Sequence, residues 1–265
     1  MVYSISNLIN EIINMKIDLK NSKLNEPIHF EYFPVTQQEI EKLKSGMSRV
    51  TVKREKNILP FNAYYLANRP GSAPRLFTRK VVLQRLKQAA KQLEPHYGLL
   101  IFDTFRTIET QTDLFNSICN EVKSQHPKWT QEQIGKEAKR FAAHPYDSAR
   151  PAPPTHNTGG ATDLTIYDLL SGKQYDFGTH FDEVADATRT DFFEQPYEAS
   201  YGYTTQEWET FQHNRRILFN LMKNVGFTNY REEWWHYDLG DWNWALELKT
   251  HWIFDSMEKR SVKNI

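Results

Sequence analysis

Apolar residues recur at helical spacing in four stretches of the chain, and each stretch begins at a threonine. A threonine hydroxyl accepts a hydrogen bond from a backbone N–H in the first helical turn, so it marks a helix start. The predicted helices begin after Thr36, Thr78, Thr130 and Thr204, and the last one ends near Gly226. All but Thr78 precede a glutamate or glutamine by three positions, which is the capping-box pattern.

Three apolar runs between these helices are typical of β-strands. Residues 97–105, "YGLLIFDTF", suit a central strand, and residues 161–169, "ATDLTIYDL", alternate after a Gly-Gly turn. Residues 233–239, "EWWHYDL", are short and aromatic, whereas the proline-rich residues 144–160 predict an irregular loop. Few βαβ alternations occur. This order favours an α+β fold: a single domain with a central, mainly antiparallel sheet and helices packed mainly on one side.

Composition and charge exclude several classes of protein. The chain of 265 residues is 39% apolar and 14% aromatic, which is ample for a packed core. Its 33 Lys and Arg residues balance its 33 Asp and Glu residues, so no global field favours nucleic acid. No segment approaches the apolar length of a membrane span. We therefore expect neither nucleic-acid binding nor membrane insertion.

The cysteine count limits disulfide and zinc chemistry, and the N-terminal sequence bears on the cellular compartment. The single cysteine, Cys119, excludes an internal disulfide framework and a multi-cysteine zinc site, and its helical surroundings predict a buried thiol. Residues 1–20 show no uninterrupted apolar stretch of the kind found in secretory leaders. The simplest location is therefore the cytoplasm. A periplasmic protein whose signal peptide was removed would have the same sequence.

Two histidines and an aspartate form a candidate metal site. His156 ends the proline-rich loop, and Asp163 follows on the next strand after a turn at Gly159 and Gly160. His236 on the aromatic strand completes the set. Three nitrogen and oxygen ligands leave a fourth position for water, which is the arrangement of a catalytic zinc.

A carboxylate beside such a site would act as a general base, and two adjacent glutamates compete for this role. Hydrolysis at a metal needs a base that takes a proton from water and returns it to the leaving amine. Side chains alternate in a flat strand, so Glu232 shares the face of His236 and Glu233 does not. Glu233 would serve only if it sits at the strand entry, on a bend or bulge.

Further polar residues follow the predicted strands. Arg106 either stabilises charge on a carbonyl oxygen or pairs with Asp103, which in turn would orient Arg106 or a metal-bound histidine. Asp182 is a candidate for holding an ammonium group. His180 is either a fourth metal ligand or a loop residue.

Four motifs together resemble a known family, the zinc D-alanyl-D-alanine dipeptidases, which include the vancomycin-resistance dipeptidase. The resemblance runs from about residue 60 to residue 250 and also includes "NRRILFNLM" and "GFTNY". The motifs, in chain order, are "DTFR", "HNTGGATDLT", "FGTHFDE" and "EEWWHYDLGDWNWA". An ordered set of four is far more specific than any one of them.

The resemblance implies hydrolysis of D-alanyl-D-alanine or a similar short D,D-dipeptide with one zinc per chain. It implies His156, Asp163 and His236 as zinc ligands. It also implies that Glu233, three positions before the histidine, is the base that activates zinc-bound water. The expected fold is that of a compact D-Ala-D-Ala metallopeptidase.

The same resemblance assigns the remaining roles and a domain division. It implies Arg106 as the group that stabilises the transition state and Asp182 as the partner of the substrate's free amino group. Residues 60–265 are the expected catalytic domain, and residues 1–59 are expected to be an extension packed on it.

The chain departs from the family pattern at two places. Thr107 stands where a proline commonly follows the arginine, and Pro154 stands where a serine is frequent. That serine helps to hold the substrate terminus, so Thr155 is the nearby hydroxyl left for substrate binding. Two alternatives remain open: a D,D-carboxypeptidase or other cell-wall peptidase of the same fold, and a catalytically idle metal-binding protein.

Overall fold

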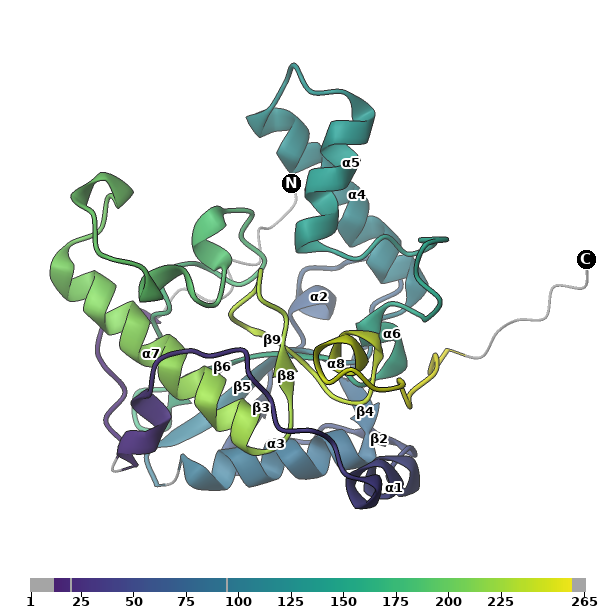
Figure 1. Cartoon of the computed structure of the whole chain (residues 1–265), viewed down its shortest axis with the longest axis horizontal. Coiled ribbons are helices and arrows are strands. Elements are labelled where there is room, and N and C mark those ends of the chain that lie inside the picture. The colour runs from purple at the N-terminus through teal and green to yellow at the C-terminus, as the bar shows by residue number, and fades with distance from the viewer. Residues whose placement is uncertain (1–11, 20, 94, 259–265) are drawn as a thin grey trace, which may run out of the picture.

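The computed structural model describes residues 12–19, 21–93 and 95–258, and within this part seven strands form one mixed sheet (Figure 1). These strands are β1 (Ile12–Ile13), β3 (Ile58–Pro60), β5 (Tyr97–Asp103), β6 (Thr162–Asp168), β7 (Gln174–Tyr175), β8 (Thr228–Asn229) and β9 (His236–Asp238). Their order is β1-β7-β6-β5-β3, with β9 paired to β6 and β8 paired to β9. The strands β2 (Arg49–Thr51) and β4 (Phe77–Arg79) form a separate antiparallel pair.

The sheet is mainly antiparallel, as predicted. The pairs β5–β6, β6–β7, β6–β9 and β8–β9 are antiparallel, and β1–β7 and β3–β5 are parallel. Every residue of β5 is buried, which agrees with its continuous apolar sequence. The α+β fold class is therefore confirmed.

Helices surround this sheet, and three of them begin at the predicted threonine caps. The helices are α1 (Gln37–Ser45), α2 (Ala63–Leu66), α3 (Lys80–Gln92), α4 (Ile108–Gln125), α5 (Gln131–Phe141), α6 (Thr155–Thr158), α7 (Thr205–Asn224) and α8 (Trp242–Glu247). The hydroxyls of Thr36, Thr130 and Thr204 accept hydrogen bonds from the backbone three residues later. That bond satisfies an otherwise free N–H of the first turn, so threonine is favoured at this position. A threonine before an apolar helical pattern therefore located these three helix starts.

Two local predictions are wrong. Thr78 does not cap α3, because it lies in β4 and donates a hydrogen bond to the carbonyl of Gly159 at 2.9 Å. The helix begins at Lys80. Cys119 is half-buried at the edge of the main core, so it is not fully enclosed. The loop predicted at residues 144–160 is interrupted by the single helical turn α6.

The described part of the N-terminal segment joins the same core as the rest of the chain. Leu24, Leu43 and Val52 are buried in the main hydrophobic cluster, and β1 extends the sheet beside β7. The boundary drawn at residue 60 stays a prediction. The interpretation of residues 1–20 as lacking a leader falls mostly on residues 1–11 and 20, which lie outside the described residues.

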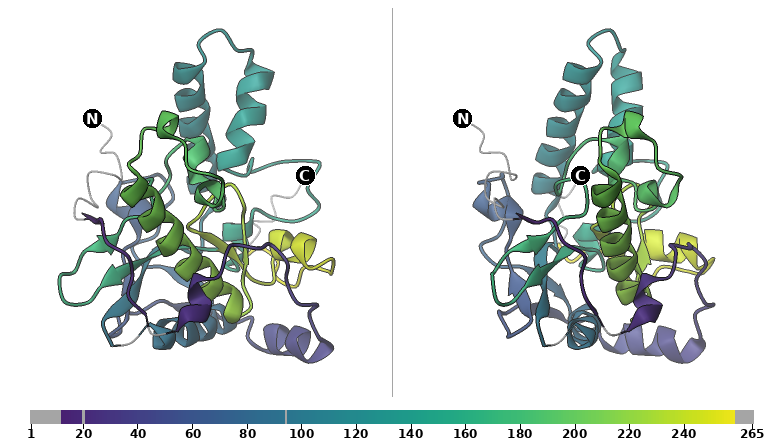
Figure 2. Two further views of the ribbon diagram at one scale, coloured as in Figure 1. Left: turned by 60° about the vertical axis from the view of Figure 1, so that its left-hand side comes forward. Right: turned by 90° about the vertical axis from the view of Figure 1, so that its left-hand side faces the viewer.

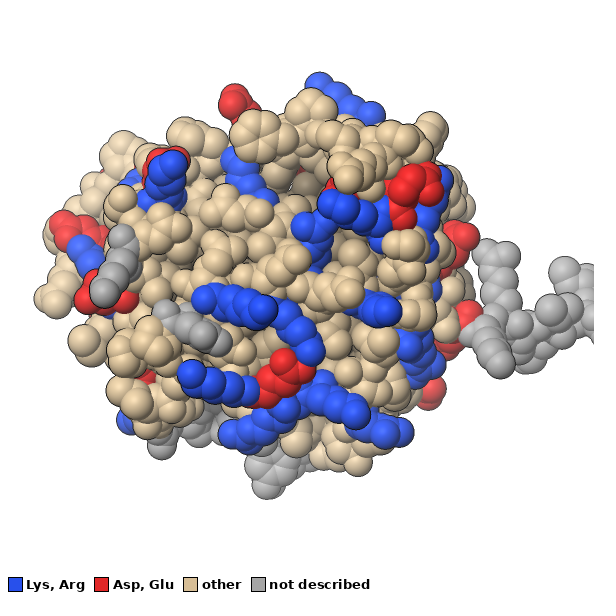
Figure 3. Space-filling model, turned by 90° about the horizontal axis from the view of Figure 1, so that it is seen from below, with Lys and Arg blue, Asp and Glu red and all other residues tan. Residues whose placement is uncertain are grey.

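The views in Figure 2 show how these elements are arranged. The helix α7 stands beside the sheet and contacts α3, while the α4–α5 pair projects beyond the rest of the molecule. From below, where α1 and α3 lie, Lys and Arg side chains are more prominent than Asp and Glu (Figure 3). No helix in the described residues has the length and apolar character needed to cross a membrane.

Candidate active site

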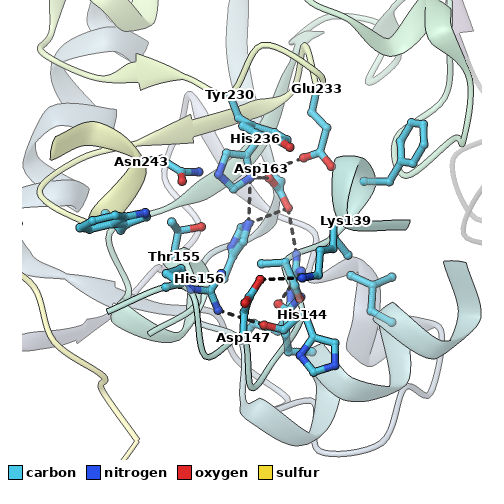
Figure 4. Close-up of a pocket in the computed structure, with 18 of the residues that line it drawn as sticks. Lys139, His144, Asp147, Thr155, His156, Asp163, Tyr230, Glu233, His236 and Asn243 are labelled. Atoms are coloured by element: carbon cyan, nitrogen blue, oxygen red, sulfur yellow. Dashed lines mark hydrogen bonds and ion pairs between the residues drawn. The ribbon is translucent and has the colours of Figure 1, made fainter. Parts of the chain in front are cut away.

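The three residues predicted as metal ligands meet at one end of the central strands. His156 lies in α6, Asp163 near the start of β6, and His236 at the start of β9. Asp163 and His236 are partners in the antiparallel β6–β9 register. One ligand atom from each of the three buried side chains lies within 4.8 Å of the others (Figure 4).

Each histidine ring is oriented by a hydrogen bond on the side that faces away from this cluster. His156 Nδ1 donates to the carbonyl oxygen of Thr104 at 2.7 Å, and His236 Nε2 donates to Asp238 Oδ1 at 2.8 Å. The other ring nitrogens, His156 Nε2 and His236 Nδ1, face each other within the cluster, 3.1 Å apart. Such outer acceptors fix the orientation of metal-binding histidines.

Asp163 completes the cluster with a buried oxygen that has no hydrogen-bond donor. Its Oδ2 lies 3.2 Å from His156 Nε2, and its Oδ1 lies 3.0 Å from His236 Nδ1. Although the second distance is short, its geometry makes no hydrogen bond, so Oδ1 is unsatisfied. A buried polar atom of this kind needs a partner. Two imidazole nitrogens and a carboxylate are a donor set that suits a divalent cation.

The electrostatics of the cluster also favour a positive charge at its centre. Burial raises the pKa of Asp163, but the two histidines outweigh it and hold that pKa below its usual range. Burial lowers the pKa of His236, and Asp238 with Asp163 outweighs it, so that pKa is well above its usual value. The metal-free cluster therefore retains a proton, which a metal ion would displace on binding.

Glu233 faces this cluster because the chain turns before β9. The N–H of Glu233 bonds to the carbonyl of Tyr230, and the N–H of His236 bonds to the carbonyl of Glu233. The predicted strand at 233–239 is thus wrong in its first residues, since β9 begins at His236. The alternation of side chains does not apply across a turn, and Glu233 Oε2 lies 3.6 Å from His236 Nδ1. Burial raises the pKa of Glu233 well above its usual value.

Glu232, the competing glutamate, points elsewhere. Its Oε2 accepts hydrogen bonds from Nε and Nη2 of Arg140 at 3.0 Å and 2.8 Å. It does not line the cavity that contains the metal-ligand cluster, whereas Glu233 does. Of the two glutamates, Glu233 is therefore the one beside the metal-ligand cluster.

Arg106 both pairs with Asp103 and lines the cavity, so the two alternatives considered from the sequence are compatible. Its Nε donates to Asp103 Oδ2 at 2.8 Å, and its Nη2 lies 3.2 Å from Asp163 Oδ2. Asp103 Oδ2 is also 3.3 Å from His156 Nδ1, so one carboxylate contacts both the arginine and a histidine. Burial would lower the pKa of Arg106, but Tyr64 and the carboxylates outweigh it, so the guanidinium stays charged. It lines the cavity.

Thr107 has a clear local role at the position where the family pattern has proline. Its side chain caps α4 by accepting a hydrogen bond from the N–H of Thr110 at 3.1 Å. The hydroxyl also bonds to the carbonyl of Gly71 at 3.1 Å. This cap fixes the start of α4 directly after Arg106, so the departure preserves the local geometry.

Asp182 lines the same cavity and carries a second unpartnered buried oxygen. Its Oδ1 accepts a hydrogen bond from the hydroxyl of Tyr64 at 3.1 Å, and its Oδ2 has no partner. The residue adopts a left-handed conformation with φ of 61°, which is uncommon outside glycine. Burial raises the pKa of Asp182 to about 7. The free oxygen is available to a donor on a ligand.

Tyr64 is a site residue that the sequence analysis missed. Its hydroxyl donates to Asp182 and accepts a hydrogen bond from Arg106 Nη2 at 3.0 Å, so it links the two. Its neighbour Tyr65 is 45% exposed. Nothing in the local sequence "NAYYLAN" separates the two tyrosines, because their difference arises from packing against distant residues.

The two remaining predicted residues differ in their location. Thr155 begins α6 and lines the cavity beside His156. His180 does not, because its backbone N–H bonds to Glu183 and its side chain lies beside a different, smaller hollow. The structure therefore does not bring His180 to the metal-ligand cluster.

The cavity itself is small and polar, with a volume of about 270 Å³. This volume is near the lower end of the range for sites that bind small molecules, roughly 300 Å³ and above. Its wall also includes residues that the sequence did not single out: Gln111, Lys139, His144, Asp147, Arg150 and Tyr230. The size excludes a large folded substrate from the cluster.

Comparison with known proteins identifies a family. A sequence model described as D-ala-D-ala dipeptidase matches residues 67–257. The D-alanyl-D-alanine dipeptidase of Synechocystis is 31% identical over 179 residues, which cover 64% of this chain and 71% of that protein. The dipeptidase of the same name from Streptomyces coelicolor is 30% identical over 177 residues, 66% of this chain and 76% of that protein.

A shorter match gives higher identity. The D-alanyl-D-alanine dipeptidase of Enterococcus faecium is 37% identical over 87 residues, which cover 33% of this chain and 37% of that protein. The extent of the family match, together with a buried cluster of three potential metal ligands in a small cavity, leads to one conclusion. The chain belongs to the D-ala-D-ala dipeptidase family and is a metallopeptidase.

Proposed function

We propose that this protein is a zinc-dependent dipeptidase that hydrolyses D-alanyl-D-alanine or a similar short D,D-dipeptide. The observation that carries this proposal is Glu233 placed 3.6 Å from His236, beside a buried cluster of three ligand atoms. Three protein ligands with an adjacent glutamate are the residues required for metal-assisted hydrolysis. The names of the related proteins support the choice of substrate.

The donor set supports zinc among the divalent ions. His156, Asp163 and His236 would hold the ion through two imidazole nitrogens and one carboxylate oxygen, a combination that zinc binds well. When bound, zinc acts as a Lewis acid that polarises the peptide carbonyl and makes water more acidic. It also adds positive charge beside Glu233, which favours the ionised carboxylate that a base requires.

The protein's own residues would complete the reaction. Glu233 takes a proton from the attacking water as the oxygen adds to the peptide carbonyl carbon, and then gives that proton to the leaving nitrogen as the C–N bond breaks. Arg106 lines the cavity with a charged guanidinium that stabilises the negative charge on the carbonyl oxygen. The products are two amino acids.

Two residues would position the dipeptide. The free Oδ2 of Asp182 accepts a hydrogen bond from the substrate's ammonium group. Thr155 offers a hydroxyl beside His156 for a second polar contact with the substrate. A cavity of about 270 Å³ favours a ligand as small as a dipeptide over longer peptides.

Hydrolysis by purified protein of known metal content tests the proposal. The substrates are D-Ala-D-Ala, its N-acetylated form and the L,L isomer, each with zinc-loaded and chelator-treated protein. We expect about one zinc per chain and turnover of only the free D,D-dipeptide, lost on chelation and restored by zinc. Turnover of the N-acetylated peptide at a similar rate would contradict the dipeptidase assignment and favour a carboxypeptidase.

A further inference from the structure

Arg150 is a half-buried cation at the cavity that, among the described residues, forms no ion pair with a carboxylate. Its Nε donates to the carbonyl of Ala152 at 3.0 Å, and its Nη2 donates to the carbonyl of His144 at 3.0 Å. Within the described residues it forms no ion pair, and its Nη1 has no hydrogen-bond partner. Burial lowers the pKa of Arg150, and the charge of Asp147 opposes this effect. An unpaired charge in such a position indicates a missing anionic partner.

The other cations that line the cavity already have partners. Arg106 is bonded to Asp103 and lies within ion-pair distance of Asp163. Lys139 pairs with Asp147 at 2.9 Å. Among the described arginines and lysines of the cavity wall, Arg150 is therefore the one without an ion pair.

Arg150 and Asp182 together present the two charges that a free dipeptide needs. The unpartnered Oδ2 of Asp182 suits an ammonium group, and the free N–H groups of Arg150 suit a carboxylate. Arg150 also lines a second, larger hollow between the proline-rich loop and residues 255–258. Asp182 lies instead against Tyr64 and Arg106 within the buried wall.

We propose that Arg150 binds the C-terminal carboxylate of the substrate and restricts the enzyme to peptides with a free C-terminus. The inference rests on the proposed function and names a further determinant of its specificity. A guanidinium matches a carboxylate through two parallel hydrogen bonds, which a single ammonium cannot reproduce. The carbonyls of His144 and Ala152 already fix the orientation of Arg150, so little side-chain entropy is lost on binding.

The test compares D-Ala-D-Ala with its C-terminal amide in wild-type protein and in Arg150→Gln and Arg150→Lys. The wild type is expected to prefer the free acid. Arg150→Gln loses about 10- to 100-fold in kcat/KM for the acid, because hydrogen bonds to a charged group are lost, with little change for the amide. The loss lies mainly in KM, since this contact is made equally in the ground state and the transition state. Arg150→Lys falls between the two.

Arg140→Gln is the matched control, because Arg140 belongs to the adjacent helix α5 but pairs with Glu232, away from the metal-ligand cluster. Its ratio of acid to amide hydrolysis should equal that of the wild type. Zinc content and thermal unfolding of each variant verify folding. Binding of the acid to Glu233→Gln with and without Arg150→Gln gives a second readout that needs no turnover.

The outcomes separate this inference from the proposed function. If the zinc-loaded wild type does not hydrolyse D-Ala-D-Ala, the proposed function fails and the inference with it. If the wild type does, but Arg150→Gln lowers acid and amide hydrolysis equally or leaves their ratio unchanged, the inference alone is overturned. Such a result would mean that Arg150 only holds the loop through its two carbonyl contacts.

Discussion

The inner wall and the rim of the cavity both carry ion pairs, but they differ in burial and in what the pairs do. At the inner wall, which Arg106 and Asp182 line, the Arg106 side chain and its partner Asp103 are 6% and 5% exposed. At the rim, the Lys139 and Asp147 side chains are 48% and 22% exposed. Removing one partner from a buried pair leaves an uncompensated charge, whereas exposed pairs contribute little. We therefore expect substitutions at the inner wall to have larger effects than substitutions at the rim.

The largest expected effect comes from removing a metal ligand beside the inner wall. His156→Ala removes the nitrogen donor that lies 3.2 Å from Asp163 Oδ2, so the cluster loses one of its three ligands. Zinc content measured by atomic absorption should fall below a tenth of that of the wild type, roughly the loss expected on a large drop in affinity, and turnover should fall to background. His144→Ala, at the rim, is the control and should retain zinc. Full zinc occupancy in His156→Ala would contradict the assigned site.

The next effect concerns Arg106, whose guanidinium has four hydrogen-bond partners. Arg106→Lys keeps the charge but not the planar fork, so we expect kcat to fall about 10²- to 10³-fold, with zinc content unchanged. Thermal unfolding should show a loss of about 1.5 to 3 kcal/mol, because the hydrogen bond from the guanidinium to the buried Asp103 is lost. A lysine variant with nearly normal kcat would show that the inner wall does not stabilise the transition state.

Asp182→Asn is expected to have an intermediate effect on substrate binding. The size of this effect depends on pH. KM for D-Ala-D-Ala at pH 8 should rise about 10- to 100-fold, because the contact to the ammonium loses its charge. In the wild type, the same contact should strengthen as pH rises through about 7, where the pKa of Asp182 lies. An unchanged KM in Asp182→Asn would exclude Asp182 from binding the amine.

The same pKa predicts how this variant changes stability. The folded carboxyl keeps its proton between about pH 4 and pH 7, where the unfolded chain has released it. The contribution of Asp182 to stability is therefore present below about pH 4 and is lost as the pH rises through 7. Asp182→Asn should stabilise the metal-free protein more at pH 8 than at pH 5, by at most about 3 kcal/mol, because about two pH units separate pH 5 from this pKa and each is worth roughly 1.4 kcal/mol. Thermal unfolding at the two pH values measures this difference. Equal shifts at both pH values would contradict this pKa.

The smallest effect is expected at the rim. Lys139→Gln removes an ion pair that is half-exposed on its lysine side, which is worth no more than about 1 kcal/mol. Its kcat/KM for D-Ala-D-Ala should stay within about fivefold of the wild type, as measured alongside Arg150→Gln. If instead Lys139→Gln is the more damaging of the two, the carboxylate contact belongs to Lys139.

The sequence predicted those features that depend on local chemistry. Three threonine caps and the two central strands are encoded within a few residues, and the three candidate metal ligands, which come from ordered motifs, lie close together in the structure. Tyr64 and Arg150 were missed because their roles depend on contacts with residues far along the chain or on the absence of a partner. The start of β9 was also misplaced, since a turn in an aromatic segment leaves no glycine or proline to mark it.

The adjacent residues Glu232 and Glu233 provide the most direct test of the catalytic assignment. Glu233 faces the metal-ligand cluster, whereas Glu232 binds Arg140. We would measure zinc content and kcat for D-Ala-D-Ala in Glu233→Gln and Glu232→Gln side by side. The account predicts normal zinc in both, a fall in kcat of about 10²- to 10⁴-fold in Glu233→Gln, and near-normal kcat in Glu232→Gln. Near-normal kcat in a zinc-loaded Glu233→Gln variant would contradict it.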